Sequence, residues 1–396
     1  MENILVINAG STSLKFSIFL ASRREGQASI DEFRLLHSGQ LDKVDDDIFT
    51  MKVDGEKREI NGEDFEYAIW RIKEVLFPEI KFDLIGFRVV HGGEKFISPT
   101  LLDSAIVREI EALNNLAPLH NPPVIARIKQ TFEAYPEIPK YAIFDTEFHS
   151  TVPEKAYLYA LPYKFYKQYK IRRYGFHGIS HEFLFSQIEQ LIANSEMRKR
   201  VITCHLGGGA SITAIKNGQS VDTSMGFTPM EGVVMATRTG DVDDGVQNYL
   251  EKNLGMSEDE INRVFNKESG LLGLSEVSSD MVKLIGLYKQ GNPAAIRALD
   301  VYIYRVQKYI GSYVAVLGGL DVLVFSGGVG SGSDFIRKKV CEGLSVFGIE
   351  VDDLKNDGKL NIENSIEIGR GKVKIFAIKT NEELMIAKKV RYSLSS

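Results

Sequence analysis

Cysteine is scarce in this sequence. Only two of its 396 residues are cysteines, Cys204 and Cys341, and they are far apart and belong to no metal-spaced motif. Two isolated thiols argue against a disulfide framework and against a structural zinc site. We therefore expect a protein of a reducing compartment.

Long apolar runs are also missing. The longest apolar region, residues 313–325, is too short for a membrane span and is interrupted by Gly318, Gly319 and Asp321. The chain begins Met-Glu-Asn and enters an apolar segment with no basic region before it, unlike a signal peptide. These features predict a soluble cytoplasmic protein with no membrane partner.

Neither sign of charge is in large excess. The net charge is -5, and no block of lysine and arginine stands out, which argues against a nucleic-acid partner. Hydrophobic residues make up 44% of the chain and charged residues 26%, as in ordinary globular proteins. The length, about two to three times that of a typical domain, predicts two domains with a cleft between them.

Three apolar runs, in contrast, each end in a polar loop that contains glycine, at residues 8–13, 205–211 and 326–333. After the first two segments the sequence alternates with period 2, which predicts a returning strand. Asn217-Gly218 is a strong hairpin signal after the second. A P-loop or dinucleotide-binding motif requires a helix at this point, so neither motif fits. Two strand–turn–strand loops in one chain suggest a duplicated domain.

Each glycine-rich segment has an ordinary structural alternative. The first, with its hydroxyls and Lys15, fits a phosphate site about as well as a polar hairpin. The second contains three consecutive glycines, which favours close approach of the backbone to an anion. The third precedes a helix-like segment that Ser333 or Asp334 could cap, and a plain loop fits it nearly as well.

Single polar residues next to these segments give weaker signals. Arg88 precedes a glycine turn, and a surface arginine is its simplest interpretation. His177 lies between two glycines, where a structural histidine is the commoner case, and its spacing to His181 does not form a zinc motif. Asp145 ends an apolar run, as functional residues of α/β proteins do. Glu382 fits either a metal-linked carboxylate or the solvated start of a helix.

The combination is more specific than its parts. Several phosphate-type loops, a lysine, two arginines in glycine-rich contexts, a histidine and a strand-end aspartate are the groups that phosphoryl transfer uses. That reaction requires positioning, Mg²⁺ and positive charge around the transferring group, with little covalent chemistry from the protein.

The order of the motifs resembles the acetate kinase family over essentially the whole chain. Ile-Asn-Ala-Gly-Ser-Thr-Ser-Leu-Lys at residues 7–15 and Tyr-Gly-Phe-His-Gly-Ile-Ser-His at residues 174–181 are similar to its two signatures. The other matching segments are residues 88–93, 117–123, 144–149, 222–226 and 380–384.

The resemblance implies an α/β protein made of two duplicated actin-like, ribonuclease H-like ATPase domains with a central cleft, in the sugar kinase, chaperone ATPase and actin superfamily. We place an N-terminal domain at residues 1–147, with residues 383–396 returning to it, and a nucleotide-binding domain at residues 148–382. The resemblance also implies a homodimer and a reversible reaction in which ATP and acetate give ADP and acetyl phosphate. Mg²⁺ would be the metal, and Mn²⁺ could replace it.

The resemblance further assigns roles to individual residues. The catalytic residues it implies are Arg88, His120, Asp145, His177 and Arg238. The acyl group would contact Val90, Leu119, Phe176 and Pro229, and Asn8 and Glu382 would serve the metal. The nucleotide would meet Ser11, Ser13, Lys15, His205, Gly207, Gly208, Gly209, Asp280, Gly328, Val329 and Gly330.

The sequence departs from the family pattern mainly among the nucleotide residues. Gly208 replaces a usual asparagine, Ser331-Gly332 a usual Glu-Asn, Val282 a common arginine and Ala236 a usual glycine. These departures leave nucleotide preference open, including a different phosphoryl donor.

Two other functions also fit this sequence. A propionate or butyrate kinase of the same family differs from an acetate kinase by the size of the acyl pocket, and Val90 favours acetate because propionate-preferring members tend to carry a smaller residue there. A non-catalytic actin-like ATPase would instead hydrolyse ATP slowly and would not respond to short carboxylates.

Overall fold

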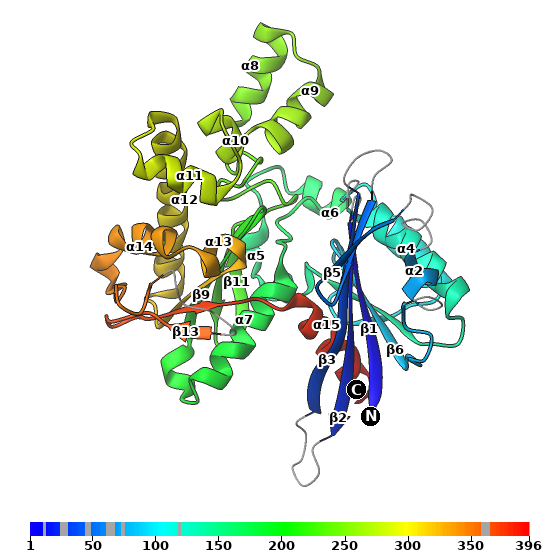
Figure 1. Cartoon of the computed structure of the whole chain (residues 1–396). Coiled ribbons are helices and arrows are strands. Elements are labelled where there is room, and N and C mark those ends of the chain that lie inside the picture. The colour runs from blue at the N-terminus through cyan, green and yellow to red at the C-terminus, as the bar shows by residue number, and fades with distance from the viewer. Residues whose placement is uncertain are drawn as a thin grey trace. The chain divides into compact units, whose positions relative to one another are not determined.

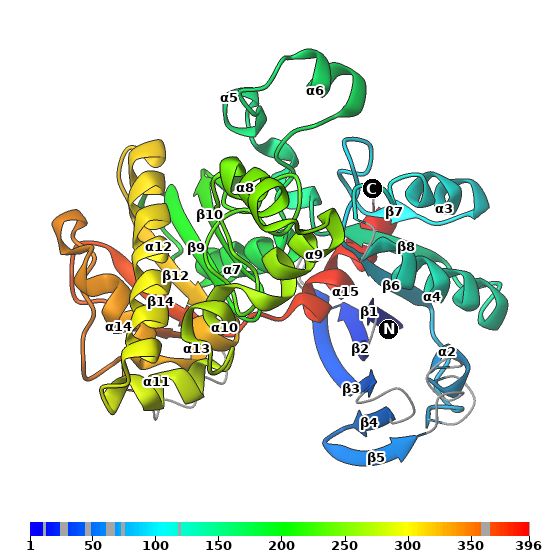
Figure 2. The same cartoon turned by 90° about the horizontal axis from the view of Figure 1, so that it is seen from above.

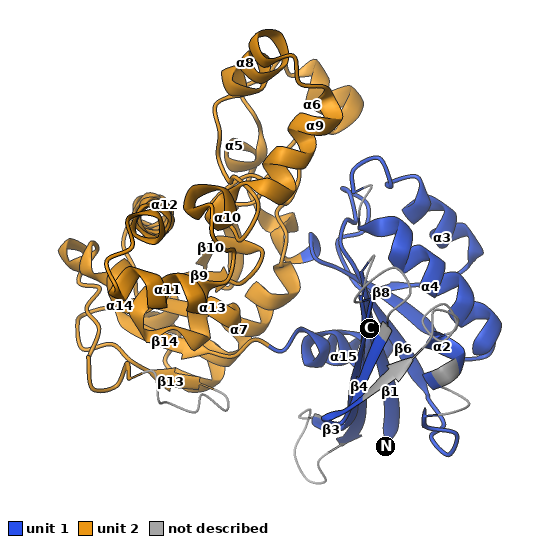
Figure 3. Ribbon diagram, turned by 45° about the horizontal axis from the view of Figure 1, so that its top comes forward, with its two compact units in different colours: residues 1–147, 381–396 blue, residues 148–380 orange. Residues whose placement is uncertain are grey.

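The computed structural model describes residues 1–10, 13–23, 31–43, 49–60, 68–72, 76–117, 120–357 and 365–395. The chain forms two compact units, which Figure 3 shows in different colours. Unit 1 comprises Met1–Glu147 and Asn381–Ser396, and unit 2 comprises Phe148–Thr380. The chain therefore re-enters unit 1 two residues before the predicted position 383. Within the described ranges, no helix combines the length and apolarity needed to cross a bilayer.

Unit 1 is built on a mixed sheet, which in its described part has eight strands in the order β5-β4-β3-β2-β1-β6-β8-β7. The strands are β1 (Glu2–Ala9), β2 (Ser13–Arg23), β3 (Asp31–Lys43), β4 (Phe49–Val53), β5 (Glu56–Ile60), β6 (Leu84–Val89), β7 (Thr100–Leu101) and β8 (Lys140–Phe144). The helices include α2 (Ala68–Arg71), α3 (Ser104–Glu111), α4 (Asn121–Ala134) and α15 (Glu382–Tyr392).

The centre of this sheet explains why residues 4–7 are continuously apolar. All four are fully buried in β1, which lies between antiparallel β2 and parallel β6. A strand covered on both faces carries no solvent-facing alternation. Helices α4 and α15 pack on opposite faces of β1 and β6 (Figure 1). The return of the chain as α15 thus completes the core of unit 1.

Gly86 of β6 sets how closely α15 approaches the sheet. A Cβ atom at this position would lie 2.8 Å from the Cγ2 atoms of Ile386 and Val390 on α15. We expect Gly86→Ala to lower the free energy of unfolding by about 1–3 kcal/mol, because the helix must move outward. Urea unfolding measures this change. Gly286→Ala is the matched control, since a Cβ at Gly286 meets no atom within 4 Å, and equal stability of both variants would contradict the packing argument.

Unit 2 contains a second mixed sheet, with six strands among its described residues in the order β11-β10-β9-β12-β14-β13. The strands are β9 (Arg200–Leu206), β10 (Ala210–Lys216), β11 (Gln219–Thr223), β12 (Val322–Ser326), β13 (Ser365–Glu367) and β14 (Lys374–Ile378). The helices include α5 (Glu154–Tyr157), α6 (Lys164–Tyr169), α7 (Gly178–Leu191), α8 (Asp244–Leu254), α9 (Glu258–Arg263), α10 (Gly270–Ser275), α11 (Met281–Lys289), α12 (Pro293–Leu317), α13 (Gly327–Gly332) and α14 (Asp334–Glu342).

The two sheets repeat one topology. In unit 1 the strands β3-β2-β1-β6-β8-β7 have the same order and relative directions as β11-β10-β9-β12-β14-β13 in unit 2. This repeat confirms the duplication predicted from the two glycine-rich loops. Both loops lead into strands, β2 and β10, as the alternation predicts. Asn217 and Gly218 form the next turn with positive φ angles of 52° and 83°.

Helices α7 and α12 cover the two faces of the second sheet. Thr203 of β9 bonds His181 on α7, whereas burial and the neighbouring Cys204, the next residue of β9, raise the pKa of Tyr302 on α12. Successive side chains of a strand point to opposite faces, which places the two helices on opposite sides. Figure 2 shows the long helix α12 and α7 separated by the strands of this sheet.

The third glycine-rich segment differs from its prediction. Residues 327–332 form the short helix α13 and not a loop, and Ser333 caps the following helix α14 by accepting from the Ile336 amide. The buried Arg337 side chain donates to the carbonyl oxygens of Gly330 and Ser331 at distances of 3.0 Å and 2.6 Å. A guanidinium that satisfies these terminal carbonyls stabilises a helix that its glycines alone would disfavour.

Candidate functional site

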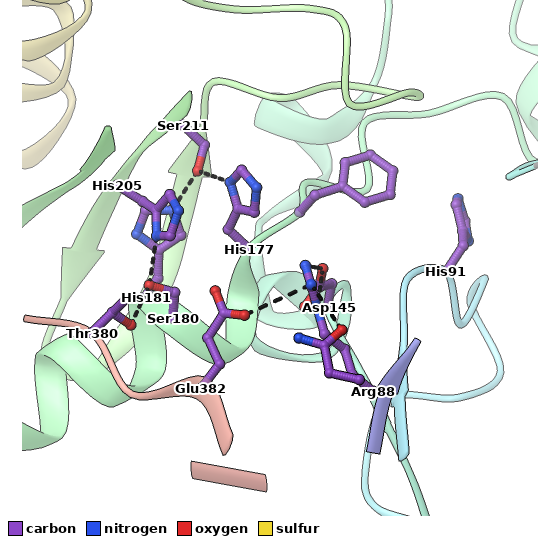
Figure 4. A network of polar contacts seen from close by, with 12 residues as sticks. Arg88, His91, Asp145, His177, Ser180, His181, His205, Ser211, Thr380 and Glu382 are labelled. Carbon is purple, nitrogen blue, oxygen red and sulfur yellow. Dashed lines mark hydrogen bonds and ion pairs between the residues drawn. The ribbon is translucent and has the colours of Figure 1, made fainter. Parts of the chain in front are cut away.

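Arg88, Asp145 and Glu382 meet at one edge of the unit 1 sheet. Arg88 belongs to the end of β6, Asp145 follows β8, and Glu382 begins α15, so three distant segments bring them together (Figure 4). The Arg88 guanidinium donates to both Asp145 oxygens, with an Nη2–Oδ2 distance of 2.6 Å. Its Nη1 lies 3.7 Å from Glu382 Oε2 and 3.4 Å from Asn8 Oδ1. The sequence predicts these residues separately, and the fold assembles them.

One positive charge faces two carboxylates in this cluster. Burial tends to lower the pKa of Arg88, but Asp145 and Glu382 raise it above its ordinary value. Burial also raises the pKa of Glu382 to about 7, against the opposing effect of Arg88. Asp145 is only 1% exposed. When Glu382 is ionised, the two carboxylates outnumber the guanidinium, and a further cation would offset the extra negative charge.

The oxygen atoms of this cluster suit a hard divalent cation. Asp145, Glu382 and Asn8 offer carboxylate and amide oxygens, the ligand type that Mg²⁺ prefers. No group of three or more His, Cys, Asp and Glu side chains placed to hold a metal occurs in the described part of the chain. Mg²⁺ commonly takes one or two carboxylates and completes its shell with water and phosphate oxygens. The residues present therefore fit this metal.

The first glycine-rich loop lies at the same end of the unit 1 sheet. Asn8 of β1 is opposite Lys15 of β2, and the Gly10 amide donates to the Ser13 carbonyl at 2.7 Å. These contacts bring the end of β1 and the start of β2 together, and phosphate binding by Ser13 and Lys15 stays a prediction. Ser11 lies outside the described residues.

The segment after β6 is held by a side-chain amide that sequence reasoning missed. Asn121 accepts from the His91 amide and donates to the His91 carbonyl, both at 3.2 Å. His91 is fully buried, and burial lowers its pKa to about 4. This pair fixes the backbone next to Val90, the predicted acyl contact. His120 precedes α4, and Leu119 lies outside the described residues.

In unit 2, the second glycine-rich loop lies against three groups predicted from other motifs and against its own His205. A Cβ atom at Gly209 would be 3.4 Å from His177 Nε2 and 3.7 Å from Arg238 Nη1. A Cβ at Gly207 would be 3.8 Å from His205 Nε2 and 3.9 Å from the Gly328 amide nitrogen. Bare glycine backbone is thus bordered by two imidazole edges, a guanidinium and a helix amide. Such a set favours an anion.

The two imidazoles are stacked and similarly anchored. The rings of His177 and His205 lie 4.4 Å apart at an angle of 24°. His177 Nδ1 bonds the Ser211 hydroxyl at 2.9 Å, and His205 Nδ1 bonds the Ser180 hydroxyl at 2.8 Å. Ser180 also contacts Thr380 (Figure 4). Fixing Nδ1 on each ring leaves the Nε2 edges facing the glycine loop.

Arg238 has no acidic partner among the described residues. Its Nη1 donates to the Pro229 carbonyl at 2.9 Å and contacts the Met235 sulfur. Burial lowers its pKa from the ordinary value, while a guanidinium nevertheless stays charged. Burying the charge of an arginine that has no carboxylate partner costs stability, and a bound anion would offset that cost.

A polar network missed by sequence reasoning supports the loop that carries Arg238. Arg173 donates to the carbonyl oxygens of residues 223–225 and pairs with Glu231, and Tyr159 donates to the other oxygen of Glu231. The Phe227 amide in turn donates to the Tyr159 hydroxyl. No local pattern marks these residues, because they are up to 72 positions apart.

The remaining predicted residues occupy unit 2 as follows. Phe176 is buried, and its carbonyl accepts from His149 Nε2 at 3.0 Å. Asp280 is exposed and caps α11 by accepting from the Lys283 amide. The residues of α13 that carry predictions are Gly328, Val329 and Gly330. Their contacts to a nucleotide stay predictions.

The two sheets and their clusters define a duplicated α/β protein with a glycine-containing loop in each unit. A family model described as the acetokinase family matches residues 3–388, and the chain belongs to this family. An acetate kinase of Fervidobacterium nodosum is 43% identical over 97% of this chain and 96% of its own length. An acetate kinase of Clostridium acetobutylicum is 42% identical over 98% of each chain.

Solved structures agree over the same length. A Porphyromonas gingivalis acetate kinase matches with a TM-score of 0.90 and 36% identity, covering 100% of both chains. A propionate kinase from Francisella tularensis subsp. tularensis matches with a TM-score of 0.89 and 36% identity, covering 99% of both. The predicted family and its two-sheet fold are thereby confirmed.

Proposed function

We propose that this chain reversibly transfers the γ-phosphoryl group of ATP to acetate, giving acetyl phosphate and ADP. The observation that carries the proposal is Arg238, a partly buried guanidinium without a carboxylate partner in the described residues, beside His177 and the bare backbone of Gly209. The names of the similar acetate kinases support the choice of acid. Acetate and the nucleotide are the proposed partners.

The residues of unit 2 would hold the phosphate chain. The backbone of Gly207, Gly208 and Gly209 carries no Cβ atoms that would block an approaching oxygen, and the Gly207 amide itself donates to the Gly209 carbonyl at 3.0 Å. Arg238 would offset the charge that develops on the transferring group, and His177 would donate from Nε2 to its oxygens. His205 would bind the nucleotide phosphates, and α13 would lie near the adenosine.

The residues of unit 1 would hold the acid and the metal. Arg88 would orient the carboxylate so that one of its oxygens attacks the phosphorus and ADP leaves. Asp145 and Glu382, assisted by Asn8, would hold Mg²⁺ or Mn²⁺, directly or through water. The metal, when bound, supplies positive charge to the nucleotide phosphates. His120 would support the acid site, and Ser13 and Lys15 would line the phosphate path.

The direct test is a hydroxamate-trap assay with ATP and Mg²⁺, comparing acetate, propionate and butyrate. We expect acyl phosphate to form, with acetate as the best acid. If no acid yields product with ATP, pyrophosphate and GTP are tried next, because Gly208, Val282, Ser331 and Gly332 depart from the family pattern. If no acyl phosphate formed with any donor, the proposal would be overturned.

Propionate is the second candidate acid, because one similar structure is a propionate kinase. The acyl pocket is proposed to use Val90, Leu119, Phe176 and Pro229. We expect Val90→Ala to raise the propionate-to-acetate ratio of kcat/KM about tenfold, since one methylene is worth about 1–3 kcal/mol in an apolar pocket. Val316→Ala, at a half-exposed position of α12, is the control. An unchanged ratio would remove Val90 from the pocket.

We also propose that the protein is a cytoplasmic homodimer. The proposal rests on the family resemblance and on the two buried free cysteines, which suit a reducing compartment. Sedimentation equilibrium tests the assembly, because a dimer has twice the chain mass of 44.3 kDa. A single species at the chain mass would exclude the dimer.

A further inference from the structure

A chain of buried hydrogen bonds connects the unit 2 sheet to His177. The Thr203 hydroxyl of β9 lies 2.7 Å from His181 Nδ1, and His181 Nε2 lies 2.7 Å from the Ser211 hydroxyl of β10. The same Ser211 oxygen lies 2.9 Å from His177 Nδ1. Thr203, His181 and Ser211 are all fully buried, so water does not compete for the first two bonds, while His177 at the end of the chain is half-buried.

The direction of the bonds follows from the Thr203 end. Within the described part of the chain, His181 Nδ1 is the one hydrogen-bond partner of the Thr203 hydroxyl. A buried hydroxyl hydrogen left without an acceptor costs roughly 1–3 kcal/mol. Thr203 therefore donates, and His181 Nδ1 accepts.

His181 sets the donor and the acceptor of the next hydrogen bond. The ring is neutral, because burial and the neighbouring His149 and His205 lower its pKa well below 6.5. A neutral imidazole with an accepting Nδ1 carries its hydrogen on Nε2. His181 Nε2 thus donates to the Ser211 oxygen, and the Ser211 hydrogen points to His177 Nδ1. Accepting at Nδ1 leaves the hydrogen of His177 on Nε2.

We propose that His181 is a positioning residue that, through Ser211, holds His177 in the tautomer with hydrogen on Nε2, the atom beside Gly209. The role in catalysis rests on the proposed function, in which this Nε2–H donates to the transferring phosphoryl group. The other tautomer would direct a lone pair at anionic oxygens. The relay excludes it before substrate binds, so no reorganisation is needed during the reaction.

The tautomer is measured by long-range ¹H–¹⁵N correlation spectra of the full chain labelled with ¹⁵N-histidine. The chain has seven histidines, and His177→Gln assigns the signal. We expect the wild type to show hydrogen on Nε2 of both His177 and His181. In Ser211→Ala we expect a mixture of tautomers at His177. Hydrogen on Nδ1 of either ring in the wild type, or an unchanged single tautomer in Ser211→Ala, would overturn the relay.

Kinetics give a second, separate readout. We expect Ser211→Ala to lower kcat about 10-fold to 100-fold with little change in the KM for ATP, less than complete removal of a transition-state donor costs. Ser211→Thr keeps the hydroxyl and should retain the rate and the tautomer. Thr213→Val is the matched control, because it removes a buried hydroxyl of the same strand that bonds Thr223 and not the relay. An equal loss in this control would reduce Ser211 to a structural role.

The spectra also separate this inference from the proposed function. A wild-type protein that makes no acyl phosphate but shows the two expected tautomers would refute the reaction and support the relay. An active protein with a mixed His177 tautomer would support the reaction and refute the relay.

Discussion

Arg238→Ala lowers acyl phosphate formation on the order of 10³-fold, the largest effect we expect from one substitution. In the ground state this guanidinium bonds a neutral carbonyl and a sulfur, and no carboxylate of the described chain neutralises it. Its charge is thus available to oxygens that become more negative as the phosphoryl group moves. The hydroxamate-trap rate measures the loss, and Arg370→Ala, a variant of an exposed arginine paired with Glu350, serves as control.

The stability of Arg238→Ala, in contrast to its activity, should not fall. Removing a partly desolvated charge that has no acidic partner relieves a cost, so Arg238→Ala should unfold at the same urea concentration as the wild type or a higher one. An inactive and equally stable variant would identify Arg238 as a functional group. A variant that keeps its rate within tenfold, or one that loses rate only because it unfolds, would contradict that role.

Local sequence patterns predicted the elements that carry the site. Alternation after the glycines marked β2 and β10 as strands, and Asn121-Pro122-Pro123 marked the start of α4. Asp145 was predicted at a strand end and lies there. Each of these signals depends on neighbours within a few residues, which is the range over which propensity and turn chemistry act.

Contacts between distant segments could not be predicted in the same way. Glu382 fits a solvated helix start in the sequence, yet its side chain is 13% exposed and lies near Arg88, about 300 residues away in the chain. The relay from Thr203 to His177 depends on the register of β9 with β10 and on the packing of α7. Hydroxyl residues in a buried strand give no signal for such a role.

The third glycine-rich segment shows tertiary structure overriding propensity. Four of the six residues of α13 are glycines, which favours a loop. Arg337, which belongs to the next helix, supplies the donors that its last carbonyls need. The departures at Gly208 and Val282 carry no such penalty, because a Cβ at Gly208 meets no atom within 4 Å and Val282 is 79% exposed. Their influence on the nucleotide stays a prediction.

Arg173→Met should lower the free energy of unfolding by about 3 kcal/mol, the second large effect we expect. The substitution removes the donor to the carbonyl oxygens of residues 223–225 and leaves Glu231 without its cation. Burial and Glu231 act in opposite directions on the Arg173 guanidinium, and its pKa is raised overall because the carboxylate, with nearby Tyr313 and Tyr159, prevails. Urea unfolding measures the loss, with Arg370→Met as the exposed control.

A double-mutant cycle can separate the contribution of the ion pair between Arg173 and Glu231 from that of simple packing. In Glu231→Gln the amide keeps the shape of the side chain but loses its charge, so the desolvated Arg173 loses its ion-pair partner. We expect the two single losses to sum to more than the loss in the double variant by about 1–3 kcal/mol, since each single change leaves one charge unpaired. Additive losses would mean that Arg173 acts only through the backbone carbonyls.

Both single variants should also lower kcat, because the segment that Arg173 and Glu231 hold leads directly into the loop of Arg238. A movement of about 1 Å in a charge-stabilising group can cost about 10²-fold in rate.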